Sequence, residues 1–307
     1  MHTPSPPGSR PVPLYPAVPL YGGGASLRPK CRGAWIHTMN HVYAEAHGAG
    51  LFMDIFQPAS PNGLAIIDVV STAWHSGRAQ IYEHVGLGVY DALCDAGFTV
   101  FALCPGSATQ YSALQMAHHV RAGIRYLKVN HDRWSIAPDR LGLLGASAGG
   151  HLAALAALQP ESAHDATRNP FLKFNTCVAA VCLFFAPTDL LDFAGSPFVS
   201  DEIAGRQIPR LLIDEDLPTP DAAAVTEGLA AISPARLAIT APPPFLVFHG
   251  DEDPLVPLEQ SEKLVDALRK AGGQAELRVK KGGAHPWPTV AHEVRAAADW
   301  FLGLLAP

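Results

Sequence analysis

Short apolar segments alternate with helix-length amphipathic segments from about residue 50 to the end of the chain. The apolar segments are rich in β-branched and aromatic residues and predict strands at 50–56, 64–70, 98–104, 140–145, 177–187, 244–250 and 274–281. Between them, apolar residues spaced by three and four predict helices at 78–97, 110–130, 148–159, 258–273 and 289–305. Continuous apolar strands separated by helices indicate an α/β fold, with a mostly parallel sheet covered on both faces.

Two regions depart from this alternation. Residues 188–243 are rich in proline, aspartate and alanine and contain no clear strand. We expect them to form a lid-like, substrate-facing insert rather than a separate domain. Residues 1–33 carry many prolines and glycines, which predicts a flexible N-terminal arm. Residues 34–307 are therefore expected to form a single domain, which is within the size range of one large α/β unit.

Composition and charge exclude several classes of protein. The chain is 48% hydrophobic and 16% charged, which is globular, and its net charge of −6 argues against a nucleic-acid partner. No apolar run reaches the ~18 residues of a membrane span, and no signal peptide is recognisable, so a cytoplasmic location is the default expectation. The five cysteines form no C-x-x-C pattern, and neither a metal site nor a cofactor is predicted.

The segment LGLLGASAGGHL (141–152) places Ser147 between a predicted strand and a predicted helix. The G-x-S-x-G pattern is weak by itself, but a sharp strand-to-helix turn is the context in which such a serine acts as a nucleophile. Side chains at 145 and 149 would collide with the neighbouring strand and helix, so glycine is required at both positions. The start of the helix also places free N–H groups beside the hydroxyl. Ser147 is therefore a candidate nucleophile.

A serine nucleophile needs a histidine to accept its proton and a carboxylate to orient that histidine. Both follow Ser147 in the chain order of this type of site, which is serine, acid, histidine. The candidate histidine is His285, because the Gly-Gly loop that carries it can return over the strand ends. His292 is a weaker candidate, since it lies inside the last predicted helix. The acid is one of three residues directly after a predicted strand: Asp251, Glu252 and Asp253.

These segments resemble the α/β-hydrolase fold, in particular its small esterases of the feruloyl esterase, hormone-sensitive-lipase-like and kynurenine-formamidase-like branches. The resemblance covers about residues 50–305 and rests on MDIFQP, APDRLGLLGASAGGHLAALAAL, PTDL and PPPFLVFHGDEDPLVPLEQSEKLVDALRKAGGQAELRVKKGGAHPW. It implies a mostly parallel sheet of about eight strands, with a catalytic triad at its carboxyl edge. The family pattern places the acid three residues before Val256, which favours Asp253.

The chain departs from this family pattern in two loops. Relatives usually carry HGGGW or HGGxW where this chain has DVVSTAWHSG (68–77), and a Tyr-Arg-Leu stretch where it has CPGSATQYS (104–112). The first loop normally donates backbone N–H groups to the oxyanion, and serine, threonine and alanine keep those groups. The resemblance therefore implies an oxyanion hole built from the amides of Thr72, Ala73 and Ala148. Three residues flank the hole and the catalytic histidine and are candidates for binding substrate: Trp74, His75 and Trp287.

The resemblance implies a serine hydrolase that cleaves small-molecule carboxylic esters through Ser147, His285 and Asp253, by way of an acyl-enzyme. Neither a metal nor an organic cofactor is required for this chemistry. Two alternatives remain: an amide, formamide or peptide hydrolase with the same machinery, and a non-catalytic binding member of the fold. The sequence leaves the acyl and alcohol specificity open, and also the oligomeric state, a homodimer included.

Overall fold

A computed structural model describes residues 35–194 and 222–306. Its centre is an eight-stranded sheet with the strand order β1-β2-β4-β3-β5-β6-β7-β8. Only the pairs of β2 with β1 and with β4 are antiparallel, so the sheet is mostly parallel, as predicted. The strands are β1 (Trp35–Ala46), β2 (Ala49–Pro58), β3 (Ala65–Val69), β4 (Thr99–Leu103), β5 (Leu141–Ala146), β6 (Ala180–Phe184), β7 (Phe245–Gly250) and β8 (Ala275–Lys280).

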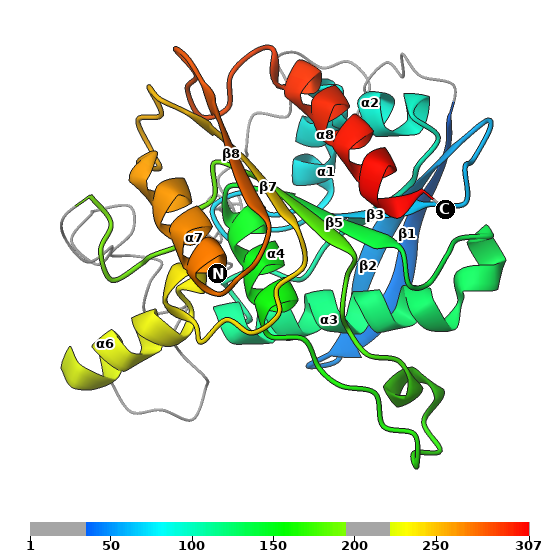
Figure 1. The fold of residues 1–307 in the computed structure, drawn as a ribbon. Coiled ribbons are helices and arrows are strands. Elements are labelled where there is room, and N and C mark those ends of the chain that lie inside the picture. Colours follow the sequence, from blue (N-terminus) through cyan, green and yellow to red (C-terminus); the bar gives the residue numbers. More distant parts are fainter. Residues whose placement is uncertain (1–34, 195–221, 307) are drawn as a thin grey trace, which may run out of the picture.

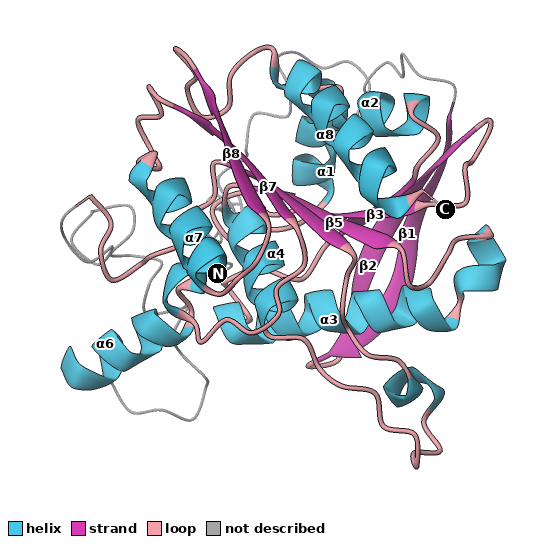
Figure 2. Ribbon diagram, in the orientation of Figure 1, coloured by secondary structure: helices cyan, strands magenta, loops and turns pink. Residues whose placement is uncertain are grey.

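Helices cover both faces of this sheet (Figure 1, Figure 2). One face packs against α1 (Arg78–Gly86), α2 (Val89–Asp95) and α8 (Val290–Leu305), and the other against α3 (Ala113–Val129), α4 (Ala148–Leu158) and α7 (Glu259–Lys270). Strands β3 to β7 are buried along almost their whole length, which accounts for their unbroken apolar sequences. The two faces give two separate hydrophobic cores.

The structure differs from the expected elements in two places. Strand β1 was not predicted, because it pairs with β2 alone and nearly all of its residues stay partly or fully exposed. The expected helix at 78–97 is two helices, since Gly88 adopts a left-handed conformation with φ 75° and ends the helical path between α1 and α2. The other predicted helices and strands are confirmed to within a few residues; α3, for example, begins after Ser112, which forms a capping box with Gln115.

The described part of the expected insert at 188–243 contains α6 (Ala222–Ala231), followed by a short 3₁₀ turn, Pro234–Arg236, and no strand. Buried hydrogen bonds from the Thr188 and Asp189 amides to Gln260 on α7 attach its first residues to the domain. Residues 195–221 of the insert and the expected arm at 1–33 lie outside the described residues. Within the described ranges, no helix is long and apolar enough to cross a membrane.

Candidate active site

Ser147, His285 and Asp253 converge at the carboxyl edge of the sheet, where they follow β5, β8 and β7, respectively. The Oγ atom of Ser147 lies 2.9 Å from Nε2 of His285, and Nδ1 of His285 lies 2.6 Å from Oδ2 of Asp253. A carboxylate only accepts hydrogen bonds, so Nδ1 carries the proton and Nε2 is left to accept the serine proton. The geometry is that of a nucleophile, a base and an orienting acid.

The backbone at Ser147 is a tight strand-to-helix turn. Ser147 has φ 52° and ψ −125°, outside the regions that L-residues prefer, and its N–H donates to Phe184 O at 2.9 Å. A Cβ added at Gly145 would lie 2.5 Å from Gly149 O, and one added at Gly149 would lie 2.1 Å from Val69 O. Both positions therefore require glycine, as the sequence predicted, because the start of α4 lies directly against β3 and β5.

Asp253 is the only one of the three candidate acids that contacts His285 among the described residues. Its carboxyl side chain is fully buried and accepts hydrogen bonds from the Leu255 and Val256 amides. Burial raises the pKa of Asp253, but hydrogen bonds from His249, His285 and the Val256 amide outweigh burial and hold that pKa well below its usual value. Asp253 is therefore ionised at neutral pH and can stabilise an imidazolium at His285.

His249 is a supporting residue that the sequence reasoning missed. It is fully buried at the end of β7, and its ring nitrogens lie 2.6 Å from Ser261 Oγ and 2.8 Å from Val256 O. These contacts fix the loop that carries Asp253. The rival residues lie elsewhere: Asp251 accepts a hydrogen bond from the Gly282 amide, and His292 is exposed on α8.

Two of the three predicted substrate-binding side chains are packing residues. Trp287 is only 2% exposed, and its indole N–H donates to Glu293 at 2.8 Å. Trp74 is 5% exposed, so neither indole can line an open pocket in this conformation. His75 is partly exposed and stays a candidate. Phe185, which was not predicted, packs edge-on against the His285 ring with the centroids 4.4 Å apart.

Residues 72–75 form a tight hairpin turn, which we call the 72–75 turn. The amides and carbonyls of Thr72 and His75 are bonded reciprocally at 2.9 Å, and Ala73 and Trp74 have φ values of 47° and 56°. Two central residues with positive φ are typical of a type I′ turn. The expected role of the Thr72 amide is therefore wrong for this conformation, because that N–H already donates to the His75 carbonyl. Among the described residues, the Ala73 and Ala148 amides have no such acceptor.

The second unusual loop, 104–112, lies against the 72–75 turn. The Ala108 amide donates to the Trp74 carbonyl at 2.8 Å, and the Ser76 amide donates to Ser107 Oγ at 2.9 Å. On the other side, the Trp74 indole N–H donates to Nδ1 of His151 on α4 at 3.1 Å. The two departures from the family pattern are thus in direct contact with each other.

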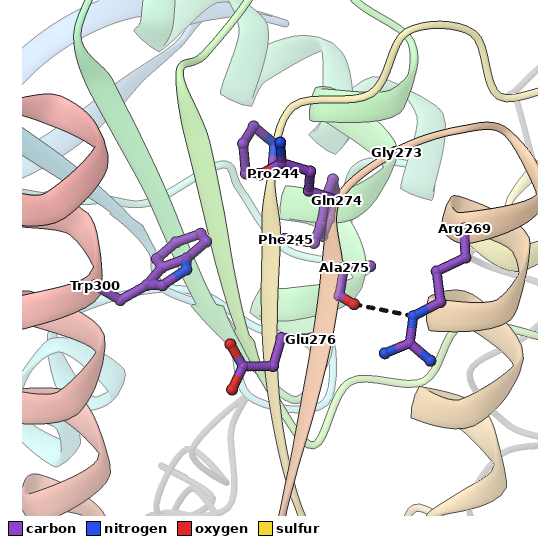
Figure 3. Close-up of a pocket in the computed structure, with 8 residues that line it drawn as sticks. All are labelled: Pro244, Phe245, Arg269, Gly273, Gln274, Ala275, Glu276 and Trp300. Atoms are coloured by element: carbon purple, nitrogen blue, oxygen red, sulfur yellow. Dashed lines mark hydrogen bonds between the residues drawn. The ribbon is translucent and has the colours of Figure 1, made fainter.

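A cavity of about 380 Å³ lies at the opposite, amino-terminal edge of the sheet (Figure 3). The start of β7, the start of β8, Arg269 and Trp300 line it, and Arg269 donates to the Ala275 carbonyl. None of the three converging residues borders this cavity, so it is separate from their site. Among the residues that the structure describes, no three His, Cys, Asp or Glu side chains are grouped to hold a metal ion.

The strand order, the turn at Ser147 and the position of His285 define an α/β-hydrolase fold. The family model BD-FAE matches residues 53–268, more than half of the chain, and the protein belongs to this family.

Two curated relatives that match well over half of this chain are named as ester hydrolases. Esterase LipQ of Mycobacterium tuberculosis is 32% identical over 193 residues, which are 61% of this chain and 43% of LipQ. The probable carboxylic ester hydrolase LipM of the same organism is 30% identical over 210 residues, 68% of this chain and 46% of LipM. The chain thus spans less than half the length of either relative.

Solved structures show the same fold. A truncated carbohydrate esterase from gut microbiota superposes with a TM-score of 0.74 at 23% identity and covers 90% of this chain and 99% of its own. Native esterase 2 of Thermogutta terrifontis gives a TM-score of 0.64 at 23% identity, over 91% of this chain and 96% of its own. At this level of identity, the likeness extends to the architecture alone.

Proposed function

We propose that this protein is a serine hydrolase of small-molecule carboxylic esters. The observation that carries the proposal is the continuous hydrogen-bonded chain from Ser147 Oγ through His285 to the buried carboxylate of Asp253. The naming of LipQ and LipM as ester hydrolases supports an ester rather than an amide as the bond that is cleaved.

In the proposed reaction, Nε2 of His285 accepts the Ser147 proton while Oγ attacks the ester carbonyl. The carbonyl oxygen becomes an oxyanion, and the Ala73 and Ala148 amides donate to it. The Ala148 amide is suited to this role because it opens α4, where backbone N–H groups lack helical acceptors and the helix dipole is positive.

Collapse of this intermediate breaks the bond to the alcohol, which leaves with the proton from His285. Water then gives its proton to His285 and attacks the acyl-serine, and the carboxylic acid is released as Ser147 regains its proton. Throughout, the Asp253 carboxylate keeps His285 in the required tautomer and stabilises its charged form.

The test is hydrolysis of p-nitrophenyl acetate by the wild type and by Ser147→Ala. We expect kcat to fall by about 10⁵- to 10⁶-fold, as for loss of the nucleophile in other serine hydrolases. The control is Ser135→Ala, because Ser135 is exposed and lies in the segment that leads into β5, whereas Ser147 follows the carboxyl end of that strand. Turnover retained in Ser147→Ala contradicts the assignment of the nucleophile.

Two further measurements separate this proposal from its alternatives. Comparison of p-nitrophenyl acetate with the matching anilide distinguishes an esterase from an amidase. Labelling with a fluorophosphonate distinguishes a catalytic protein from a binding member of the fold, since only an activated serine is phosphonylated. Folded protein that stays unlabelled at Ser147 excludes catalysis.

A further inference from the structure

The 72–75 turn is held in a conformation that its own residues disfavour. Ala73 and Trp74 are both left-handed, where glycine would be free of strain. Such conformations persist only where the surrounding structure imposes them. Contacts outside the turn must therefore fix the position of the Ala73 amide.

One such contact comes from the helix that carries the nucleophile. His151 lies one turn after Ser147, and its N–H donates to the Ser147 carbonyl at 3.0 Å. The His151 side chain is fully buried, and its ring meets the Trp74 indole edge-on with the centroids 5.6 Å apart. His151 thus connects the 72–75 turn to the backbone of Ser147, since its own backbone bonds to Ser147 and its side chain contacts Trp74.

The hydrogen bonds of His151 leave its ring a single orientation. The Trp74 indole N–H only donates, so Nδ1 of His151 accepts, at 3.1 Å. The Ile232 carbonyl only accepts, so Nε2 of His151 donates, at 2.6 Å. The imidazole is therefore neutral, with its proton on Nε2. Both nitrogens are used, and a rotated ring or a second proton would break the contact with Trp74.

The Ile232 contact also connects the insert to the site. Ile232 directly follows α6 and is 1% exposed, so the carbonyl that orients His151 belongs to the buried end of the insert. On its other side, Trp74 is held by the Ala108 amide of the 104–112 loop. Trp74 is thus fixed at its indole and at its carbonyl by two different segments.

We propose that His151 is a positioning residue, which acts through Trp74 to hold the Ala73 amide where it can donate to the oxyanion formed at Ser147. In this protein the hydrogen bond from Trp74 to His151 holds the left-handed turn in place, whereas glycines in the usual loop can adopt such a conformation without strain. The inference rests on the proposed function, because it assigns a role in that same reaction.

The test compares His151→Phe, His151→Gln and Trp74→Phe in p-nitrophenyl acetate hydrolysis, with active sites counted by fluorophosphonate titration. Phenylalanine at 151 keeps a ring but removes both hydrogen bonds, whereas glutamine offers a donor and an acceptor on one side chain. Trp74→Phe removes the indole donor together with part of the ring, and it leaves the His151 side chain unchanged. His292→Phe is the matched control, since His292 is an exposed histidine on a different helix, α8.

Loss of an oxyanion donor costs about 100- to 1000-fold, so displacing one is expected to lower kcat per titrated site by about 10- to 100-fold in His151→Phe and Trp74→Phe. KM should change little, because the hole acts mainly on the transition state. The affinity for a trifluoromethyl ketone, an analogue of the transition state, should fall in the same variants and in proportion to kcat/KM. His151→Gln should recover most of the loss, and His151→Phe combined with Trp74→Phe should be no worse than either alone.

If His151 and Trp74 only stabilise the fold, the variants should have fewer active sites by titration but an unchanged kcat per active site. That result in all three variants overturns the inference. If His151→Phe does not fold, Trp74→Phe and His151→Gln still decide it. These outcomes differ from failure of the proposed function, which would show as turnover by Ser147→Ala.

Discussion

Replacing Ala73 by glycine tests whether the 72–75 turn is strained as the structure shows. Ala73 has φ 47° and its side chain is exposed, so removing the methyl group leaves no cavity. An L-residue in the left-handed region costs roughly 1–2 kcal/mol, which glycine avoids. Glycine also makes the unfolded chain more flexible, which takes back about 0.4–1 kcal/mol. The expected net gain in the free energy of unfolding is about 1 kcal/mol.

Urea unfolding at neutral pH, with the midpoint and slope determined separately, measures this gain. Two alanines give matched controls. Ala241 is also exposed and left-handed, with φ 45°, so Ala241→Gly should stabilise to a similar extent. Ala267 lies inside α7, where the same change should cost about 1 kcal/mol. Ala73→Gly that destabilises as Ala267→Gly does would refute the left-handed turn.

The same variant, Ala73→Gly, also tests whether contacts at Trp74 hold the 72–75 turn during catalysis. If contacts at Trp74 fix the turn, a more flexible residue 73 stays in place, and kcat should remain within about threefold of the wild type. In the His151→Phe background those contacts are weakened, and the same glycine should lower kcat further. Equal kinetic effects in both backgrounds would contradict the role assigned to Trp74.

Three further changes have definite expected outcomes. Asp253→Asn removes the carboxylate that fixes the tautomer of His285, and steady-state kinetics should show kcat lower by about 10⁴-fold, whereas an unchanged kcat would exclude Asp253 as the orienting acid. Burial lowers the pKa of His151 to about 4 from 6.5, so its contribution to stability is present above pH 6.5 and falls as the pH drops towards 4. Urea unfolding should show the wild type losing about 3 kcal/mol more than His151→Gln over that range, and parallel losses would contradict this. In Gly149→Ala the new Cβ would lie 2.1 Å from Val69 O, so thermal unfolding should report a loss of about 2 kcal/mol, and a variant as stable as the wild type would show that β3 and α4 are less close than described.

The elements buried on both sides could be read from the sequence, because burial on both sides leaves a continuous apolar run. The buried strands β3 and β5 fall within one residue of the expected ranges. Strand β1 could not be found this way, since it is an edge strand with exposed apolar residues such as Ile36 and Val42. Its place depends on pairing with β2, which is a contact between segments and leaves little trace in the local pattern.

The same distinction separates what could and could not be predicted at the site. Ser147, His285 and Asp253 each follow a strand end, and the ends of parallel strands meet at one edge, so their convergence follows from order along the chain. The Thr72 amide was assigned wrongly because the loop was assumed to keep the shape it has with glycines. In the structure, residues 72–75 form a type I′ turn, and its closing bond takes that amide.

His151 and the 104–112 loop escaped prediction for a related reason. His151 lies in a buried helix of alanines and leucines, and nothing near it in the sequence indicates that Trp74, 77 positions earlier, is its partner. The loop looked like an unrelated departure from the family pattern. In the structure both contact the same tryptophan, so the second departure supplies anchors that the first one makes necessary. A loop that loses its glycines can keep a tight turn only if other segments hold it, and the two changes are expected to occur together wherever this form of the site is found.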